Sequence, residues 1–216
     1  MKKKYLLCAM VSACISLNVF GFDSEKTDQA KQVQQVAIEA KTKLMKRLAN
    51  TEYFTAEFAQ HVFDEEQNLL QKSEGQLAVQ KPNLVSWQTL TPEESLIVSD
   101  GSDLWFYDPF IEQASVYDVN ASIANTPILL LTSNDEQLWS QYQVTQLTDD
   151  SYEIRSSNMD SQVKSPKLLF AKDSPLLSGF EILDTTGQLS VITLNKVNNK
   201  EPIALVRFEF SLPEGV

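Results

Sequence analysis

Hydrophobic and polar residues alternate from residue 53 to residue 63, which is the pattern of a strand with one buried face. Two shorter segments on either side of Pro82 alternate in the same way, and Pro82 suits a strand end better than a strand centre. The apolar positions that share a face within each segment are Phe54, Ala56, Phe58 and Val62, then Leu77 and Val79, then Val85 and Trp87.

The segment 80–113 reads QKPNLVSWQTLTPEESLIVSDGSDLWFYDPFIEQ and predicts three or four short strands joined by tight turns. Asp100-Gly101 lies between apolar runs, where Asp-Gly favours a hairpin, and Asp108-Pro109 ends the next strand. The register of this hairpin is open by one residue. A shift would exchange the two faces for Leu96, Val98, Leu104 and Phe106.

Further strands follow at similar spacing, separated by clusters of Asp, Asn and Gly that favour turns. We expect them over 115–117, 142–147, 152–156, 167–171, 179–183, 188–197 and 204–211. With the earlier segments this makes about eleven strands, which predicts a strongly twisted antiparallel sheet or an open barrel.

Two segments break this rhythm and predict helices. Residues 27–50 place small apolar side chains at steps of three and four, with Thr27 or Asp28 as a possible N-cap. Residues 121–134 contain Thr126-Pro127 at a helix start, followed by an isoleucine and three leucines. A short helix that is apolar all round needs partners on every side, so it is either an ordinary core helix or one wall of a ligand cavity.

The N-terminal residues have the pattern of a secretory leader. Three lysines precede a mostly apolar run that is too short for a convincing membrane span, and small residues suit cleavage before Phe22. We therefore expect a signal peptide over 1–21 and a single exported domain over 22–216. Val11-Ser12-Ala13-Cys14 is a competing lipidation motif, which would make Cys14 a lipid-anchored N-terminus.

Composition argues against most kinds of chemistry. Both cysteines lie in the leader, so the mature chain is expected to have no disulfide and no thiol chemistry. The net charge of −11 would become −14 without the leader, which disfavours binding to nucleic acid and to anionic lipid. His61 is the only histidine, which argues against a catalytic triad and against zinc. Glu93-Glu94 and Asp64 to Glu66 could pair as catalytic carboxylates, but solvated turns explain them better.

The order of the motifs resembles a known family. K-P-N-L-x-x-W is followed by P-x-E-S-x-x-V-S-D-G-x-x-L-W-F-Y-x-P-F-x-E-Q, with FTAEFAQ upstream and Asn125-Thr126-Pro127 downstream. These motifs are similar to those of the periplasmic outer-membrane lipoprotein carrier proteins of Gram-negative bacteria, the LolA family. The resemblance covers nearly the whole chain after the leader.

The resemblance implies an open, strongly curved antiparallel half-barrel of about eleven strands, covered by helices that act as a movable lid. It implies a periplasmic carrier, not an enzyme and without a cofactor, that shields lipoprotein acyl chains in a hydrophobic cavity. The implied partners are acylated lipoproteins as cargo, an inner-membrane ABC exporter as donor and an outer-membrane receptor as acceptor. No nucleic acid is expected, and the chain would be a monomer.

We expect the cavity to be lined from the sheet and from the lid, although any of these side chains could simply be core. The sheet residues are Phe54, Phe58, Leu77, Val79, Val85, Trp87, Leu96, Val98, Leu104 and Phe106. The lid residues are Val36, Ala40, Leu44, Leu129 and Leu130. The family has an arginine before Pro-Asn-Leu that holds the lid closed. This chain has Lys81 there, which we expect to be a weaker latch because lysine lacks the planar fork of arginine.

Two other functions remain open. The chain could be a lipid-anchored outer-membrane receptor of the same architecture, which cleavage at Cys14 would support. It could also be an acidic exported β-domain that binds another protein through Trp105, Tyr107 and Phe110.

Overall fold

The computed structural model describes residues 22–123, 126–133, 135–157 and 165–213. The expected signal peptide over residues 1–21 and the cysteine at position 14 lie outside these ranges. The chain divides into two compact units, Met1–Val36 and Ala37–Val216. The described part of the first unit is the beginning of helix α1, and the second unit contains the rest of that helix and the sheet.

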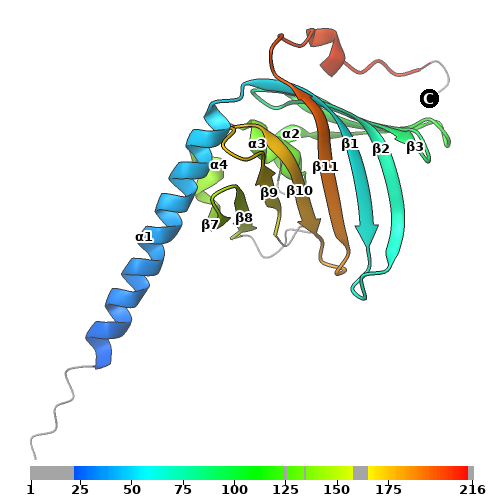
Figure 1. The fold of residues 1–216 in the computed structure, drawn as a ribbon. Coiled ribbons are helices and arrows are strands. Elements are labelled where there is room, and N and C mark those ends of the chain that lie inside the picture. Colours follow the sequence, from blue (N-terminus) through cyan, green and yellow to red (C-terminus); the bar gives the residue numbers. More distant parts are fainter. Residues whose placement is uncertain (1–21, 124–125, 134, 158–164, 214–216) are drawn as a thin grey trace, which may run out of the picture. The chain divides into compact units, whose positions relative to one another are not determined.

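An eleven-stranded antiparallel sheet forms the second unit, as the alternating patterns predict, and it curves without closing into a barrel (Figure 1). Its order is β6-β5-β4-β3-β2-β1-β11-β10-β9-β8-β7, so β1 and β11 join two runs of sequential hairpins. The strands are β1 (Tyr53–Phe63), β2 (Leu69–Gln80), β3 (Leu84–Thr91), β4 (Ser95–Asp100), β5 (Asp103–Asp108), β6 (Gln113–Asp118), β7 (Tyr142–Thr148), β8 (Ser151–Ser156), β9 (Lys167–Phe170), β10 (Leu177–Leu183) and β11 (Leu189–Asn198).

Within the described residues, four α-helices accompany the sheet: α1 (Phe22–Ala49), α2 (Val119–Ser122), α3 (Pro127–Thr132) and α4 (Glu136–Ser140). Helix α1 begins at Phe22, so the expected cap at Thr27 or Asp28 is wrong. Thr126 precedes α3 with proline at its start, as predicted, but its side chain makes no capping hydrogen bond. Helix α4 was not expected; the Asp135 carboxylate accepts hydrogen bonds from Gln137 N and Leu138 N and starts it.

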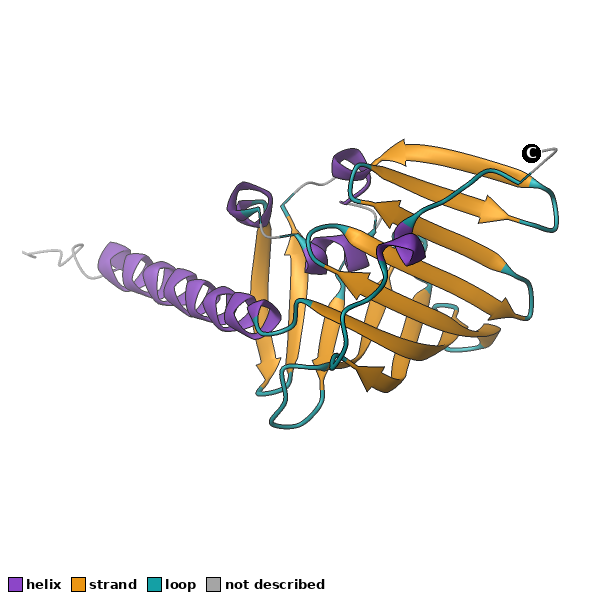
Figure 2. Ribbon diagram, turned by 90° about the horizontal axis from the view of Figure 1, so that it is seen from above, coloured by secondary structure: helices purple, strands orange, loops and turns teal. Residues whose placement is uncertain are grey.

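One face of the sheet, called here the inner face, packs against the second half of α1 and the three short helices (Figure 2). Even positions of β1 and odd positions of β2 and β3 point to this face, because directly paired residues share a side of the sheet. Leu44, Val85, Leu104 and Leu129 are all completely buried in the resulting core. The inner face is therefore the apolar side that the alternation predicted.

The opposite, outer face is crossed by the C-terminal segment (Figure 2). The strand expected over 204–211 is wrong: Leu205–Phe208 form a 3-10 helix, η2, which contacts β3 and β4. Phe208 is buried there, and Arg207 Nη2 donates a hydrogen bond to Gln76 Oε1 over 2.9 Å. The Phe210 ring lies 5.2 Å from Trp105 and 5.6 Å from Tyr107. These side-chain contacts take the place of another strand pairing.

The Asp100-Gly101 hairpin resolves the open register and corrects two predictions. Leu96 pairs with Tyr107 and Val98 with Trp105, so these four side chains share the outer face. Leu96 and Val98 therefore do not face the expected cavity, whereas Leu104 and Phe106 do. The physical reason is the even number of residues, 100–103, between the paired Ser99 and Leu104, which exchanges odd and even positions across the turn.

Candidate functional site

The inner face carries a continuous row of apolar side chains beneath the helices. Phe54 pairs with Val79 and Val79 with Val85, while Leu104 lies two strands farther along. The exposed fractions of these four side chains lie between 0 and 6%. Ala40 and Leu44 from α1, and Leu129 and Leu130 from α3, belong to the same buried cluster. The sheet and the helices thus share one apolar layer.

Three aromatic rings lie next to this apolar row, farther along the strands. The Phe58 and Trp87 ring centroids are 4.3 Å apart, and the Phe180 ring lies edge-on to Trp87 at 5.8 Å. Gly75 allows this packing, because a Cβ at that position would lie 2.7 Å from the Phe58 ring and 2.0 Å from Gln88 O. We call Phe58, Trp87 and Phe180 the aromatic group.

Two spaces of different size adjoin the inner face. A cavity of about 20 Å³ lies beside Phe54 and Lys81, which is room for about one water molecule. A larger groove of about 370 Å³ is lined by Leu104, Phe106, Tyr117 and residues of the α2 region. Whether either space is the cavity that receives acyl chains stays a prediction. Helix side chains occupy the apolar layer, and a ligand would have to displace them.

Lys81 joins the sheet to the C-terminal end of α1. Its Nζ donates a hydrogen bond to Leu48 O over 2.7 Å, and Lys81 N donates to Glu52 O over 2.8 Å. Burial lowers the pKa of the Lys81 ammonium, and the nearby Glu52 carboxylate opposes that shift. The side chain thus lies where a lid latch was expected. Its role in holding the lid stays a prediction.

Arg47 precedes Leu48, the residue that Lys81 contacts, and makes a larger set of hydrogen bonds to the other half of the sheet. Nη1 donates to Asp149 O over 2.8 Å, Nη2 to Asp150 Oδ1 over 2.7 Å, and Nε to Ser174 O over 2.9 Å. The guanidinium also lies 4.3 Å from the Phe170 ring centroid. Arg47 therefore clamps the end of α1 to the β7–β8 and β9–β10 turns. The sequence showed only a basic residue that suits a helix C-terminus.

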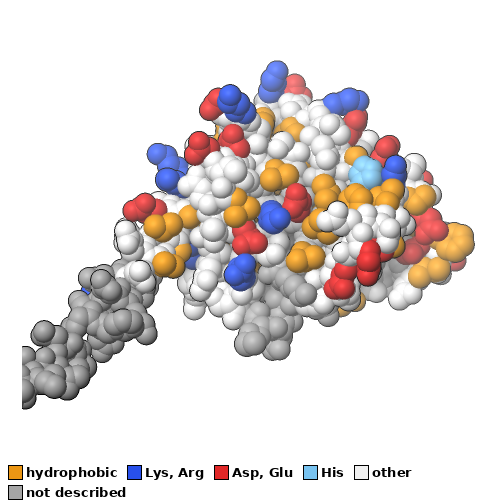
Figure 3. Space-filling model, turned by 60° about the horizontal axis from the view of Figure 1, so that its bottom comes forward, with side chains coloured by type: hydrophobic (Ala, Val, Ile, Leu, Met, Phe, Trp, Pro, Cys, Tyr) orange, Lys and Arg blue, Asp and Glu red, His pale blue; other side chains and the backbone are white. Residues whose placement is uncertain are grey.

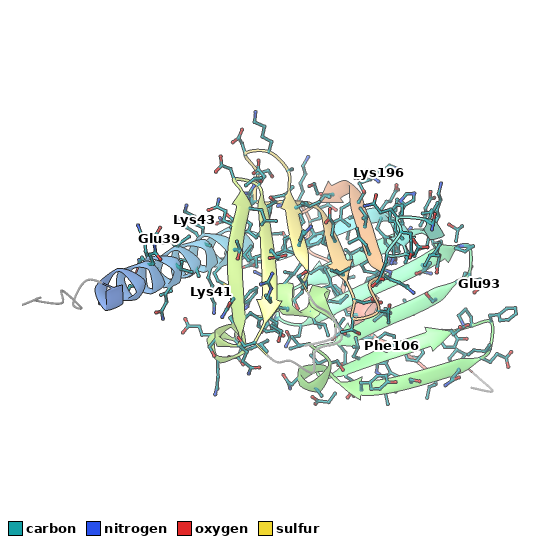
Figure 4. The ribbon with its side chains drawn as sticks, turned by 90° about the horizontal axis from the view of Figure 1, so that it is seen from below. Glu39, Lys41, Lys43, Glu93, Phe106 and Lys196 are labelled. Carbon is teal, nitrogen blue, oxygen red and sulfur yellow. The ribbon has the colours of Figure 1, made fainter. Side chains whose placement is uncertain are left out.

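Lys41 and Lys43 extend these contacts along α1 (Figure 4). Lys41 Nζ donates to Trp139 O and, over 3.3 Å, to Tyr142 O, while Lys43 Nζ donates to Gln146 Oε1 over 3.3 Å. Burial lowers the pKa of Lys41. Because Trp139 O lies at the C-terminal end of α4, Lys41 also places a cation where the helix dipole favours one.

The structure brings most of the predicted lining residues together. Buried in the shared apolar layer are Phe54, Phe58, Leu77, Val79, Val85, Leu104, Ala40, Leu44, Leu129 and Leu130, and Trp87 packs against it. Phe106 faces the same side but remains 37% exposed, beside the larger groove. Val36 belongs to the first unit, so its expected place in the cavity stays a prediction. Whether any of these side chains contacts lipid also stays a prediction.

A second groove, of about 670 Å³, lies on the outer face beneath the C-terminal segment. Glu57, Lys196 and Arg207 line it, and the Lys196 Nζ–Glu57 Oε1 pair at 2.8 Å is largely exposed. Solvent-exposed ion pairs of this kind contribute little to stability. The lining of this groove combines these charged side chains with apolar ones such as Ile203 and Val206.

Acidic residues gather in the turns that follow β1, β3, β5 and β10, which lie at the same end of the sheet. The described residues of these turns include Asp64, Glu65 and Glu66, then Glu93 and Glu94, then Glu112, then Asp184, and they include no lysine or arginine; Asp108 is the last residue of β5. Figure 3 shows hydrophobic side chains lying among such acidic ones near the histidine. Phe110 and Ile111, in the β5–β6 turn, are 84% and 58% exposed.

Two kinds of site are not found within the described ranges. No group of three or more His, Cys, Asp or Glu side chains there has an arrangement that could hold a metal ion. No described helix is both long enough and apolar enough to cross a membrane.

The sequence is similar to one characterised family over most of its length. The model of the family described as outer membrane lipoprotein carrier protein LolA matches residues 49–211. The chain is 39% identical to the outer-membrane lipoprotein carrier protein of Aeromonas salmonicida, over 84% of this chain and 89% of the relative. It is 33% identical to the protein of the same description from Edwardsiella ictaluri, over 100% of this chain and 96% of the relative.

Solved structures with lower sequence identity are also similar to the chain over much of its length. A LolA superfamily protein from Nitrosomonas europaea is 10% identical, with a TM-score of 0.49, over 79% of this chain and 98% of that protein.

Proposed function

The chain belongs to the LolA family of outer-membrane lipoprotein carrier proteins, and on that basis we propose that it carries lipoproteins with their acyl chains shielded against the inner face of the sheet. The relatives' names favour the carrier over the receptor and over the general interaction module. They describe carriers rather than enzymes.

One structural observation supports the inner face as the place where acyl chains bind. The inner face carries an apolar layer across β1 to β5, yet this layer is covered by separate helices instead of by further sheet. Helices that rest on an apolar surface can be replaced by another apolar group, because the burial of hydrocarbon is non-directional. The inner face can therefore exchange helix side chains for acyl chains.

Energetics explain why such exchange needs a closed and an open state. Each buried methylene contributes about 0.8 kcal/mol, so a 16-carbon chain left in water would cost about 13 kcal/mol. A site that is already vacant would hold the chain too tightly to release it. Helices that compete for the same surface lower the net gain, and a ligand then shifts the balance between the two states by its differential affinity.

We infer a periplasmic, monomeric carrier that receives lipoproteins from an inner-membrane ABC exporter and delivers them to an outer-membrane receptor. The acidic turns at one end of the sheet support a carrier that leaves membranes readily, because anionic headgroups repel them. A net charge of −11 supports the same view and disfavours nucleic acid as a partner.

Depletion of the protein in its host tests the function. We expect outer-membrane lipoproteins to accumulate at the inner membrane, and re-expression of the chain to restore their distribution. Normal lipoprotein distribution after complete depletion would contradict the proposal. The mature N-terminus should be read by mass spectrometry of the same cells: Phe22 supports the soluble carrier, whereas a lipidated Cys14 supports the receptor.

A further inference from the structure

The inner face is not apolar throughout, and the polar part begins abruptly next to the aromatic group. Phe58 and Gln60 point to the same side of β1, because the pairing of β1 with β2 is regular from Tyr53 to Val62. Gln60 pairs with Ser73 on β2, while Ser190 on β11 lies diagonally across from it. We call Ser190, Gln60 and Ser73 the polar row.

The polar row is joined by hydrogen bonds at the long end of the usual range. Gln60 Nε2 donates to Ser190 Oγ over 3.3 Å, and Ser73 Oγ donates to Gln60 Oε1 over 3.4 Å. Typical bonds of these kinds are about 2.7 to 3.2 Å and about 2.5 to 3.0 Å long. A primary amide has two N–H donors and two acceptor lone pairs, and these bonds use one of each. The row can therefore accept a better partner.

The burial of the polar row is what makes it unusual. Ser73 is only 4% exposed and Gln60 is half-buried, whereas polar side chains at a sheet end are normally solvated. Buried polar groups cost free energy unless they are well hydrogen-bonded. Along β1 the inner positions change from Phe54, Ala56 and Phe58, which are buried, to Gln60 and Val62, which are half-buried. The polar row thus marks the boundary between the covered apolar layer and the open end.

From this placement we propose that the polar row binds the ester or amide carbonyl groups that join acyl chains to a lipoprotein. This inference rests on the proposed function, because it assumes that acyl chains occupy the apolar layer. The carbonyl oxygens of the linkage then reach the boundary where the hydrocarbon ends. Gln60 Nε2–H and Ser73 Oγ–H donate to them, and the row selects chains that are linked through carbonyls over plain hydrocarbon.

Two ligands that differ only in the carbonyls test the selection. One is a dipalmitoyl-glyceryl-cysteinyl peptide with ester links, and the other is the same peptide with ether links. We expect the wild-type chain to bind the diester about tenfold more tightly than the diether, as one or two hydrogen bonds would give. Gln60→Leu should abolish this ratio by weakening the diester alone.

The control applies the same substitution to the other side of the sheet. Gln88→Leu lies on β3, where Gln88 pairs with Gln76 on the outer face, and it should leave the ratio unchanged. Ser73→Ala removes one donor with little change in volume and should lower the ratio by a few-fold even if Gln60→Leu is unstable.

The outcomes separate the inference from the proposed function. Equal binding of both ligands by the wild-type chain, or an unchanged ratio in Gln60→Leu and Ser73→Ala, would overturn the role of the polar row and leave the carrier intact. Failure of the wild-type chain to bind either ligand would instead contradict the proposed function.

Discussion

Arg47 and Lys81 hold the same end of α1, but they do so in different ways. Arg47 bonds to three carbonyls and one carboxylate from the β7–β8 and β9–β10 turns, and only 15% of its side chain is exposed. Lys81 gives one side-chain hydrogen bond from the β2 side of the sheet. If α1 acts as the predicted lid, we expect it to separate first from the β1–β6 half of the sheet, where its side-chain contacts are fewer, and to stay attached to the β7–β10 half.

The difference also follows from the chemistry of the two cations. A guanidinium has five N–H donors in a rigid fork and stacks on aromatic rings, as Arg47 does on Phe170. An ammonium is a compact charge whose desolvation is costly, and burial lowers the pKa of Lys81 for that reason. Arg47 is therefore the stronger anchor. The hydrogen bond of Lys81 gains little beyond the cost of desolvating its ammonium, which suits the predicted role of Lys81 as a latch that opens.

Removal of the apolar packing of α1 next to Arg47 and Leu48 should have the largest effect on stability. Leu44 lies one turn before both contacts and is fully buried, so Leu44→Ala should lower the free energy of unfolding by about 2 to 5 kcal/mol. Urea denaturation measures this change. Lys46→Ala, at an exposed position of the same helix, should change stability by less than about 0.5 kcal/mol. Similar small losses in both variants would show that α1 does not depend on the apolar layer.

Loss of the strong anchor should rank second. Arg47→Ala leaves several partly buried acceptors without a donor and should cost about 2 to 3 kcal/mol, while Arg47→Lys should recover only part of this. The matched control is Lys43→Ala, which removes one exposed cation with a single 3.3 Å contact. If Arg47→Ala is no more destabilising than Lys43→Ala in urea denaturation, the clamp is unimportant.

Changes to the weak anchor should alter the opening of α1 more than the stability of the whole domain. Lys81→Leu removes the donor to Leu48 O, and we expect amide exchange in the second half of α1 to speed up by about tenfold, which corresponds to about 1.4 kcal/mol. Lys81→Arg should slow it and make lipid release more complete, because a more stable closed state competes better with the acyl chains. Hydrogen exchange measured by mass spectrometry follows both. Unchanged exchange in the two variants would refute the latch.

The pH dependence of stability should show the smallest difference. The pKa of Lys81 is lower in the folded chain than in the unfolded chain, so the unfolded chain binds more protons between those two values. The contribution of Lys81 to stability therefore increases as the pH rises from the lowered pKa toward 10.5. In denaturation from pH 7 to 10, the free energy of unfolding of the wild type should rise relative to that of Lys81→Met. A difference between the two that does not change with pH would contradict this.

Much of the sheet could be predicted because its signal is local. The alternation at Phe54 to Val62 and at Val85 to Trp87 reports one buried face directly. The start of β2 was missed because Leu69 to Glu74 is mostly polar or exposed, and Leu96 and Val98 were misplaced because one residue of turn length decides their face.

The polar anchors could not be predicted in the same way. The partners of Arg47 lie about a hundred residues away and are mostly backbone carbonyls, which no side-chain pattern in the sequence identifies. Lys81 was identified only because a resemblance pointed to its position. The C-terminal segment has the alternation of a strand, yet Phe208 and Phe210 use it to cover the outer face without pairing.

Quenching of tryptophan fluorescence by brominated acyl chains tests the central claim most directly, because the chain has a tryptophan on each face of the sheet. Trp87 faces the apolar layer and Trp105 faces the C-terminal segment. Two variants would each keep one of them, with the other and Trp139 replaced by phenylalanine. A brominated lipopeptide should quench Trp87 strongly and Trp105 weakly. Equal quenching, or stronger quenching of Trp105, would contradict acyl-chain binding at the inner face.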